Sequence, residues 1–310
     1  MRKISLFNLT LGWLLLAFCW PAHAAENLQL HKISNQVYAI IGPLSNRSAE
    51  NFGNNASFGF VVTNEGVVLV DPGGSYRGAE AIHTLIKQVT DKPVKRVINT
   101  GGQDHRWLGN GYFIKLGARI IASRYAVADQ RARFSEQFSA LDMMMGKDAL
   151  TGTEAVYADE IFDQALSFDF GGVRFELQHP SRAHTPGDSF VWLPQQRVLF
   201  SGDIVYVDRM LGVGAQSNSR DWLTAFDALS ALKPEVLVPG HGPVTTLKNA
   251  QRDTRDYLVF LRQAVGEFIA NGGGIENIGS IDQSRFKYLA NFDELKGRNA
   301  QQVFQELEWE

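Results

Sequence analysis

Three histidines and two aspartates have the type and setting of metal ligands or acid–base groups. His184, Asp203 and His241 each follow an apolar segment and lie beside glycine or proline, which allow a tight turn with the side chain directed into a cleft. Asp104 and His105 lie in a further loop of the same kind. Imidazole and carboxylate groups suit zinc in a site without thiolates. Bound zinc would lower the pKa of its water to about 7 and make hydroxide available for attack on a carbonyl or ester.

The composition and the absence of other known motifs exclude several alternative classes of protein. The chain has 310 residues, 45% of them hydrophobic and 20% charged, with one Cys and seven His. This composition excludes disordered, collagen-like and disulfide-stapled proteins, and a net charge of −3 provides no basic field for nucleic acid. The sequence contains no dinucleotide-binding GxGxxG, no phosphate-loop motif and no GxSxG nucleophile motif.

The N-terminus predicts export. Arg2 and Lys3 precede the apolar run Leu9–Trp20, and a small-x-small site ends at Ala24. These features indicate a signal peptide over residues 1–24, cleaved after Ala24, and a periplasmic mature chain. The apolar run is shorter than the roughly 20 residues that a membrane span needs, which disfavours an anchor. Because cleavage removes the only Cys, the mature chain must build any metal site from His and carboxylates.

The elements that position these loops mix short strands with helices. Runs of β-branched and aromatic residues predict strands at 37–41, 58–63, 67–70, 95–98, 119–122, 165–170, 173–177, 190–193, 198–200 and 236–238. Apolar residues at helical spacing predict helices at 77–89, 109–115, 125–145, 222–232, 244–270 and 298–307. Two strand-rich halves, each followed by helices, predict an α/β fold that is a four-layer αβ/βα sandwich.

Four loop motifs in order resemble the metallo-β-lactamase-fold superfamily of metallohydrolases. They are the strings Asp71-Pro72-Gly73, Ala183-His184-Thr185-Pro186-Gly187-Asp188, Phe200-Ser201-Gly202-Asp203 and Pro239-Gly240-His241-Gly242. The resemblance covers about residues 36–245, within one domain that we expect to span 25–310 and to end in a helical tail. It implies metal ligation by His184, Asp203 and His241. It also implies hydrolysis of an ester, thioester or lactam of small size, with zinc as the expected ion and iron or manganese as alternatives.

The first metal loop departs from the family pattern, His-x-His-x-Asp-His after a strand ending in Asn-Thr. This chain has Asn-Thr at 99–100, followed by Gly-Gly-Gln-Asp-His-Arg. Pairing without gaps puts Gly101 and Gln103 at the first two His positions, His105 at the Asp position and Arg106 at the last His position.

A second pairing slides this loop by one residue. It matches Asp104 and His105 to the family's Asp-His, which makes Asp104 a candidate catalytic carboxylate and keeps His105 as a ligand. The ungapped pairing is favoured for the backbone because both of its flanks match, and there His105 is a candidate ligand in place of Asp. In either pairing the loop has lost the first His pair. We therefore expect one metal ion at most.

Two further residues near the loops have open roles. Arg106 could bind a carboxylate or phosphate of a ligand, because guanidinium recognises such groups bidentately, or it could form a salt bridge with Asp104 or Asp203. Asp71 could shape the site through hydrogen bonds to the residues around the metal, or it could simply form the turn beside Pro72.

The chain also resembles a narrower group, the quinoprotein relay system metallohydrolases. The resemblance rests on the predicted export signal, the altered loop 101–106 and the helical tail. That resemblance implies an accessory role beside a periplasmic quinoprotein dehydrogenase. The alternative hypothesis is a non-catalytic accessory or ligand-binding protein on the same fold, because Gly101, Gln103 and Arg106 stand where ligands are expected. No sequence feature supports a flavin- or haem-binding electron carrier.

Overall fold

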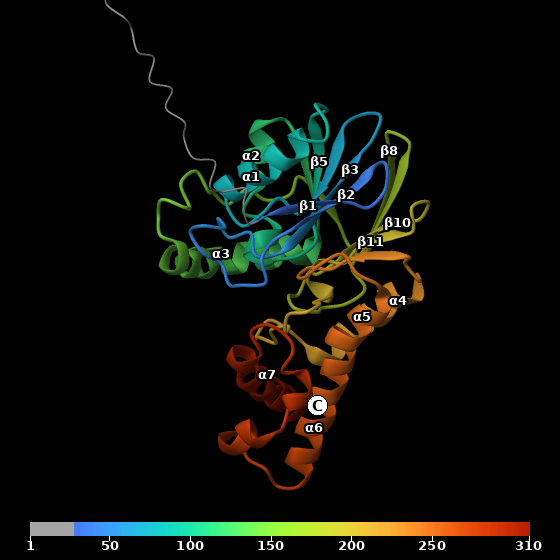
Figure 1. The fold of residues 1–310 in the computed structure, drawn as a ribbon. Coiled ribbons are helices and arrows are strands. Elements are labelled where there is room, and N and C mark those ends of the chain that lie inside the picture. Colours follow the sequence, from blue (N-terminus) through green and yellow to red (C-terminus); the bar gives the residue numbers. More distant parts are fainter. Residues whose placement is uncertain (1–27) are drawn as a thin grey trace, which may run out of the picture.

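Two β-sheets lie face to face in the computed structural model, which describes residues 28–310 (Figure 1). The predicted signal peptide lies outside the described residues. The first sheet has seven strands in sequence order: β1 (Gln29–Lys32), β2 (Val37–Ile41), β3 (Ser57–Val62), β4 (Val67–Val70), β5 (Val94–Asn99), β6 (Arg119–Ser123) and β7 (Glu160–Phe162). The second sheet has five strands in the order β12-β11-β10-β9-β8: β8 (Ala165–Phe170), β9 (Val173–Gln178), β10 (Phe190–Leu193), β11 (Val198–Phe200) and β12 (Val236–Val238).

Helices cover the outer faces of both sheets. The helices are α1 (Tyr76–Lys87), α2 (Asn110–Lys115), α3 (Arg124–Met145), α4 (Ser219–Ala231), α5 (Leu247–Ala250), α6 (Asp256–Ala270) and α7 (Phe292–Leu307). The first three pack on the first sheet, and α4, α6 and α7 share a core with the second sheet. A third core of apolar side chains lies between the sheets. The structure thus confirms the predicted four-layer αβ/βα sandwich.

Alternation along the strands explains how one sheet serves two cores. In β3, Phe58 and Phe60 point to the helices, whereas Val61 points to the other sheet, as expected when successive side chains face opposite sides. The pairs β4–β5, β5–β6, β6–β7 and β11–β12 are parallel. Parallel strands end at the same edge, so the loops after β4, β5, β11 and β12 gather at one end of the sandwich.

Three predicted helix starts are wrong by three or more residues. The helix predicted from 222 begins at Ser219. The helix predicted from 244 begins at Leu247, because Thr245 pairs through its backbone with Leu237 at the edge of the second sheet. The helix predicted from 298 begins at Phe292. A π-helical turn, Gln251–Arg255, separates α5 from α6. Among residues 28–310, no helix is both long enough and apolar enough to cross a membrane.

Candidate metal centre

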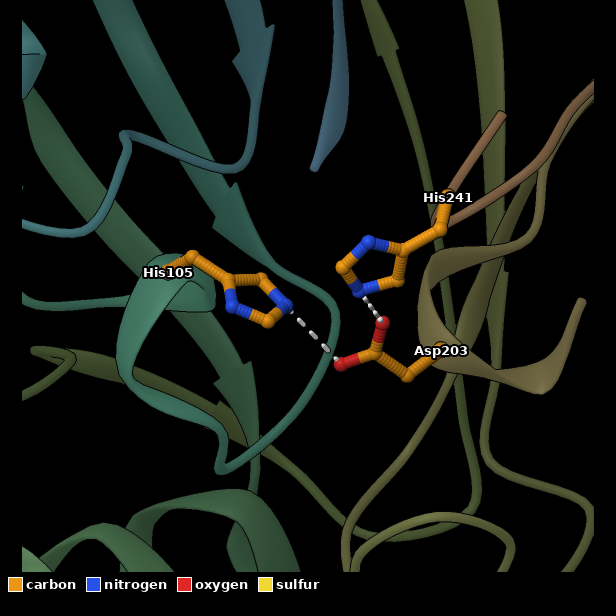
Figure 2. A group of neighbouring side chains, drawn as sticks. All are labelled: His105, Asp203 and His241. Carbon is orange, nitrogen blue, oxygen red and sulfur yellow. Dashed lines mark hydrogen bonds and ion pairs between the residues drawn. The ribbon is translucent and has the colours of Figure 1, made fainter. Parts of the chain in front are cut away.

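Three loops that follow buried strands bring His105, Asp203 and His241 together (Figure 2). His105 lies in the 3₁₀ turn Asp104–Arg106 after β5, Asp203 in the turn Gly202–Ile204 after β11, and His241 just after β12. All three side chains are buried, and one ligand atom from each lies within 4.8 Å of the other two. We call these three residues the ligand cluster.

Glycine lets two of these loops meet through their backbones. A Cβ atom on Gly240 would lie only 2.4 Å from the carbonyl oxygen of Gly202, and Gly202 itself has a φ of +50°. Because β11 and β12 are parallel and leave the sheet at the same edge, this contact sets Asp203 beside His241. Glycine is therefore required at positions 202 and 240 because a side chain at either position would disturb this contact or the backbone conformation.

The hydrogen bonding of His241 leaves a lone pair facing a carboxylate. Its Nδ1 donates to the carbonyl oxygen of Asn55 at 2.8 Å, so Nε2 is unprotonated in the neutral ring. Burial lowers the pKa of His241 well below its usual range, although Asp203 opposes this shift. Nε2 nevertheless lies 3.3 Å from Oδ1 of Asp203. Two acceptors thus face each other, an arrangement that a cation between them would stabilise.

His105 supplies the third side of the cluster. Its Nε2 lies 3.2 Å from Oδ2 of Asp203. Ligand atoms bound at about 2.0–2.1 Å in a tetrahedron lie about 3.3 Å apart. Each contact of Asp203, one at each carboxylate oxygen, therefore has the spacing of neighbouring zinc ligands. Because one ligand atom from each of the three residues lies within 4.8 Å of the others, the residues present fit a metal.

Asp104 lies behind His105 and is not among the residues that line the cavity. Its Oδ1 accepts hydrogen bonds from Arg47 Nη2 at 2.6 Å and from the backbone N–H of His105 at 2.6 Å. The same oxygen lies 3.0 Å from His105 Nδ1, and Arg47 Nη2 lies 2.9 Å from that nitrogen. Burial opposes ionisation of Asp104, but Arg47 and His105 outweigh it and hold its pKa well below the usual carboxyl range. The structure thus directs His105 to the centre and places Asp104 where it positions the His105 ring.

Arg106 is fully buried and closes the base of the centre. Its Nη2 donates to Asp203 Oδ1 at 2.7 Å and to the carbonyl oxygen of Gly240 at 2.8 Å. Its Nη1 donates to Asp71 Oδ2 at 2.9 Å and to the carbonyl oxygen of Ser57 at 3.0 Å. Burial opposes the charge, but Asp203 and Asp71 raise the pKa of Arg106 above its ordinary value. Of the two roles considered from the sequence, the structure shows the salt bridge, to Asp203 and not to Asp104.

Asp71 connects Arg106 to the loop after β5. Its Oδ1 accepts from the backbone N–H of Thr100 at 2.8 Å, and its Oδ2 accepts from the Thr100 hydroxyl at 2.7 Å. Burial raises the pKa of Asp71, and the Arg106 guanidinium opposes that rise. Its backbone has a φ of +63°, in the left-handed region. Asp71 therefore makes a strained turn and also holds two parts of the centre in place.

His184 borders the same cavity but stands outside the ligand cluster. Its Nδ1 donates to the carbonyl oxygen of Gly212 at 2.9 Å, and burial lowers its pKa. The neutral ring therefore keeps Nε2 as an acceptor. Anchoring of one ring nitrogen by a carbonyl is the usual support of a metal-binding or acid–base histidine. The structure thus separates His184 from the three residues that meet directly.

Carboxylates fill the space beside the loop positions that lack histidine. A Cβ atom on Gly101 would lie 2.4 Å from Asp188 Oδ1, and one on Gly102 would lie 1.9 Å from Asp129 Oδ2. Asp188 is itself fixed by the backbone N–H and hydroxyl of Thr185, at 2.7 and 2.6 Å. A side chain at position 101 or 102 therefore cannot enter without displacing a buried carboxylate.

A cavity of about 330 Å³ opens onto the centre. Tyr206 borders it and stacks on His241, with ring centroids 4.6 Å apart. The lining comprises Asn46, Arg47, Gln103, His105, Met144, His184, Tyr206, Arg209, Met210, Gly212, Val213, Gly214, Gln216, His241, Glu294, Leu295, Arg298 and Asn299. Sequence reasoning missed Arg47, Arg209 and Arg298, which belong to no recognisable motif and come from distant segments.

Comparison with known sequences identifies related hydrolases. Residues 52–241, more than half of the chain, match the family model described as the metallo-beta-lactamase superfamily. A type 2 metallo-beta-lactamase of Elizabethkingia meningoseptica is 26% identical over 189 residues, covering 59% of this chain and 67% of the relative. A linear primary-alkylsulfatase of a Pseudomonas species is 22% identical over 254 residues, covering 67% of this chain and 46% of the relative.

Solved structures give the same picture of the fold. A metallo-beta-lactamase from Pontibacter korlensis matches with a TM-score of 0.57 and 25% identity, covering 74% of this chain and 97% of that chain. A stereoselective inverting sec-alkylsulfatase from Pseudomonas sp. matches with a TM-score of 0.70 and 17% identity, covering 90% of this chain and 50% of that chain. This chain thus spans about half the length of the alkylsulfatases that it matches.

Proposed function

Because this chain belongs to the metallo-β-lactamase superfamily, we propose that it is a hydrolase that uses one metal ion at the ligand cluster. The observation that carries the proposal is the 3.3 Å contact between His241 Nε2 and Asp203 Oδ1, two acceptors that a cation would join. We expect zinc, with iron or manganese as alternatives. The closed space beside Gly101, and a glutamine at position 103 where the family has histidine, support one ion rather than two.

The residues around the ligand cluster would hold the Asp203 carboxylate and the His105 ring in position for a metal ion. When bound, a divalent metal would supply Lewis acidity and lower the pKa of water to about 7. Arg106 and Asp71 fix the Asp203 carboxylate, and Asp104 fixes the His105 ring. Burial raises the pKa of Tyr206 well above its usual value, so its hydroxyl stays protonated and can donate to a substrate oxygen.

We propose an ester, thioester or lactam as the substrate class, with sulfate esters among the esters. Support comes from the relatives, which are named as β-lactamases and alkylsulfatases. Because the chain spans about half of the alkylsulfatases, their full activity does not transfer directly. The cavity volume of about 330 Å³ favours a small molecule.

Metal content of the purified mature chain tests the proposal. We expect one bound equivalent per chain, hydrolysis that is lost on chelation, and loss of both in His241→Ala. His83→Ala is the matched control, because His83 lies on α1 and bonds Tyr112. A folded chain that binds zinc, iron or manganese no better than about 1 mM, an affinity of only about 4 kcal/mol, would refute the metal hydrolase.

A second function has its own support. Arg106 already gives Asp203 a cationic partner at 2.7 Å, as a non-catalytic ligand-binding protein on this fold would need. In that case chelation would leave the stability and ligand binding of the chain unchanged. Metal-dependent turnover would eliminate this alternative.

We further propose that residues 1–24 direct export, that residues 25–310 form the periplasmic domain, and that the protein assists a quinoprotein dehydrogenase system. The Arg2-Lys3 start and the apolar run that follows support export. The support for the quinoprotein role is the altered loop together with the helical tail. An N-terminus at Ala25 in periplasmic extract is the expected result, and loss of quinoprotein-dependent growth on deletion tests the accessory role.

A further inference from the structure

One guanidinium in the cavity lacks an ionic partner. Arg209 is only 6% exposed and lines the cavity. Its Nη1 donates to the carbonyl oxygens of Leu44 and Ser45, and its Nη2 donates to Asn46 Oδ1 at 3.3 Å. Its Nε has no hydrogen-bond partner. Within residues 28–310, all of its partners are uncharged.

Arg106 also has an unpartnered Nε, but unlike Arg209 it has ionic partners. Its charge meets two carboxylates, those of Asp71 and Asp203, at 2.9 and 2.7 Å. A buried charge without a counter-ion is costly, because the protein interior solvates it less well than water. An anion that enters the cavity would therefore stabilise the buried charge of Arg209 by acting as its counter-ion.

The charges around Arg209 favour the same ligand. Arg47 and Arg298 also line the cavity, together with the carboxylate of Glu294; Arg298 and Glu294 are both exposed, and Glu294 accepts a hydrogen bond from Asn46. Arg47 is neutralised by Asp104 at 2.6 Å, which leaves Arg209 and Arg298 as the cations available to a ligand. Guanidinium groups bind carboxylate, sulfate and phosphate oxygens through short charge-assisted hydrogen bonds.

The segment of α7 that carries Arg298 is held in place by the next residue, Asn299. Asn299 accepts from the backbone N–H of Val213 at 2.8 Å and donates to the carbonyl oxygen of Leu211 at 2.8 Å. These bonds hold α7 against the cavity wall. Helix α7 lies beyond the segment 52–241 that matches the family model, so Arg298 comes from outside that segment.

We propose that the cavity binds a small molecule carrying an oxyanion, held by Arg209 and Arg298 beside the ligand cluster. Tyr206, which stacks on His241, lines the same cavity as both arginines, so an anion bound there would lie near the ligand cluster. The oxyanion can belong to a sulfate, a phosphate or a carboxylate group. This inference rests on the proposed hydrolase function for its substrate class, whereas the anion site itself needs no metal.

Calorimetric titration of the full mature chain with sodium sulfate, phosphate and benzoate tests the site, before and after chelation of metal. We expect saturable binding of at least one anion in both states, and the tightest of the three identifies the group. Arg298→Gln should weaken that binding about tenfold, the value of one charge-assisted contact. Arg209→Lys should also weaken it, because one ammonium cannot reproduce the fork of donors.

Arg220→Gln is the matched control, since Arg220 is an exposed arginine of α4 outside the cavity. It should bind anions as tightly as the unmodified chain. The proposal is overturned if no anion binds, or if Arg298→Gln and folded Arg209→Lys both keep the original affinity. Anion binding by a chain that takes up no zinc, iron or manganese even when the ion is added would refute the hydrolase proposal and leave the anion site standing, which separates the two failures.

Discussion

Replacing Arg106 with Met removes the cation at the base of the centre. Arg106 makes four hydrogen bonds with Asp71, Asp203, Ser57 and Gly240, and its side chain is fully buried. The variant would leave two carboxylates buried beside each other without a counter-ion. Removing one partner of a buried ion pair typically costs about 3–5 kcal/mol. At roughly 2–4 °C per kcal/mol, the metal-free variant should melt about 6–20 °C lower than the unmodified chain.

The loss should depend on pH with a definite sign. Without Arg106, burial and mutual repulsion would raise the pKa of Asp71 and Asp203 above their unfolded values. Groups with a raised folded pKa contribute stability at low pH and lose it as the pH rises through that pKa. The deficit of Arg106→Met should therefore be larger at pH 8 than at pH 5.

Urea unfolding of chelated protein, followed by circular dichroism, measures the effect. Arg119→Met is the control, because Arg119 and Asp159 form an exposed pair at 3.4 Å, and such pairs contribute less than about 1 kcal/mol. A deficit for Arg106→Met no greater than that of the control, at both pH values, would refute the electrostatic reasoning. Added zinc should restore more stability to Arg106→Met than to the unmodified chain, since it becomes the sole cation beside Asp203.

Three further predictions follow from the same contacts. Gly101→His should lower stability by about 1–3 kcal/mol through overpacking and should leave the zinc stoichiometry by mass spectrometry unchanged at one or below, because a Cβ there lies 2.4 Å from a carboxylate oxygen. In chelated protein, burial depresses the folded pKa of His241, so the neutral ring's contribution to stability is lost as the pH falls below the unfolded pKa. In urea titrations, His241→Asn should therefore reduce the slope of unfolding free energy against pH, between about pH 5 and 6.5, by up to 1.4 kcal/mol per pH unit. Asp104→Asn should weaken metal affinity about 10–100-fold by competition titration, because Asp104 orients His105; unchanged affinity with lost turnover would instead assign Asp104 a direct catalytic role.

Most strands were predictable because their signals are local, although β1 and β7 were not predicted. The β-branched runs at 67–70 and 236–238 match β4 and β12 residue for residue. A ligand beside glycine after such a run, as at Asp203 or His241, is a pattern of adjacent letters. The direction of Arg106 was not predictable, because it depends on Asp71 and on carbonyl oxygens from two other segments.

The cavity cations escaped prediction for a related reason. Arg209 bonds carbonyl oxygens of residues 44 and 45, far away in the chain, and any residue supplies a carbonyl. Arg298 was predicted to lie on a helix, but its place in the cavity lining depends on how α7 packs against distant segments. Both residues therefore required the tertiary structure.

The charge balance at the centre links the missing histidines to the presence of Arg106. Asp71 and Asp203 bring two negative charges and Arg106 returns one positive charge, while His241 stays neutral through burial. One divalent ion then leaves the centre with a single positive charge, whereas two would leave three in a space shielded from water. Because a guanidinium needs no histidine ligands and stays charged, Arg106 would act as the second cation if the proposed single metal ion binds. The remaining positive charge would face a cavity that already holds Arg209, so both features select for an anionic ligand.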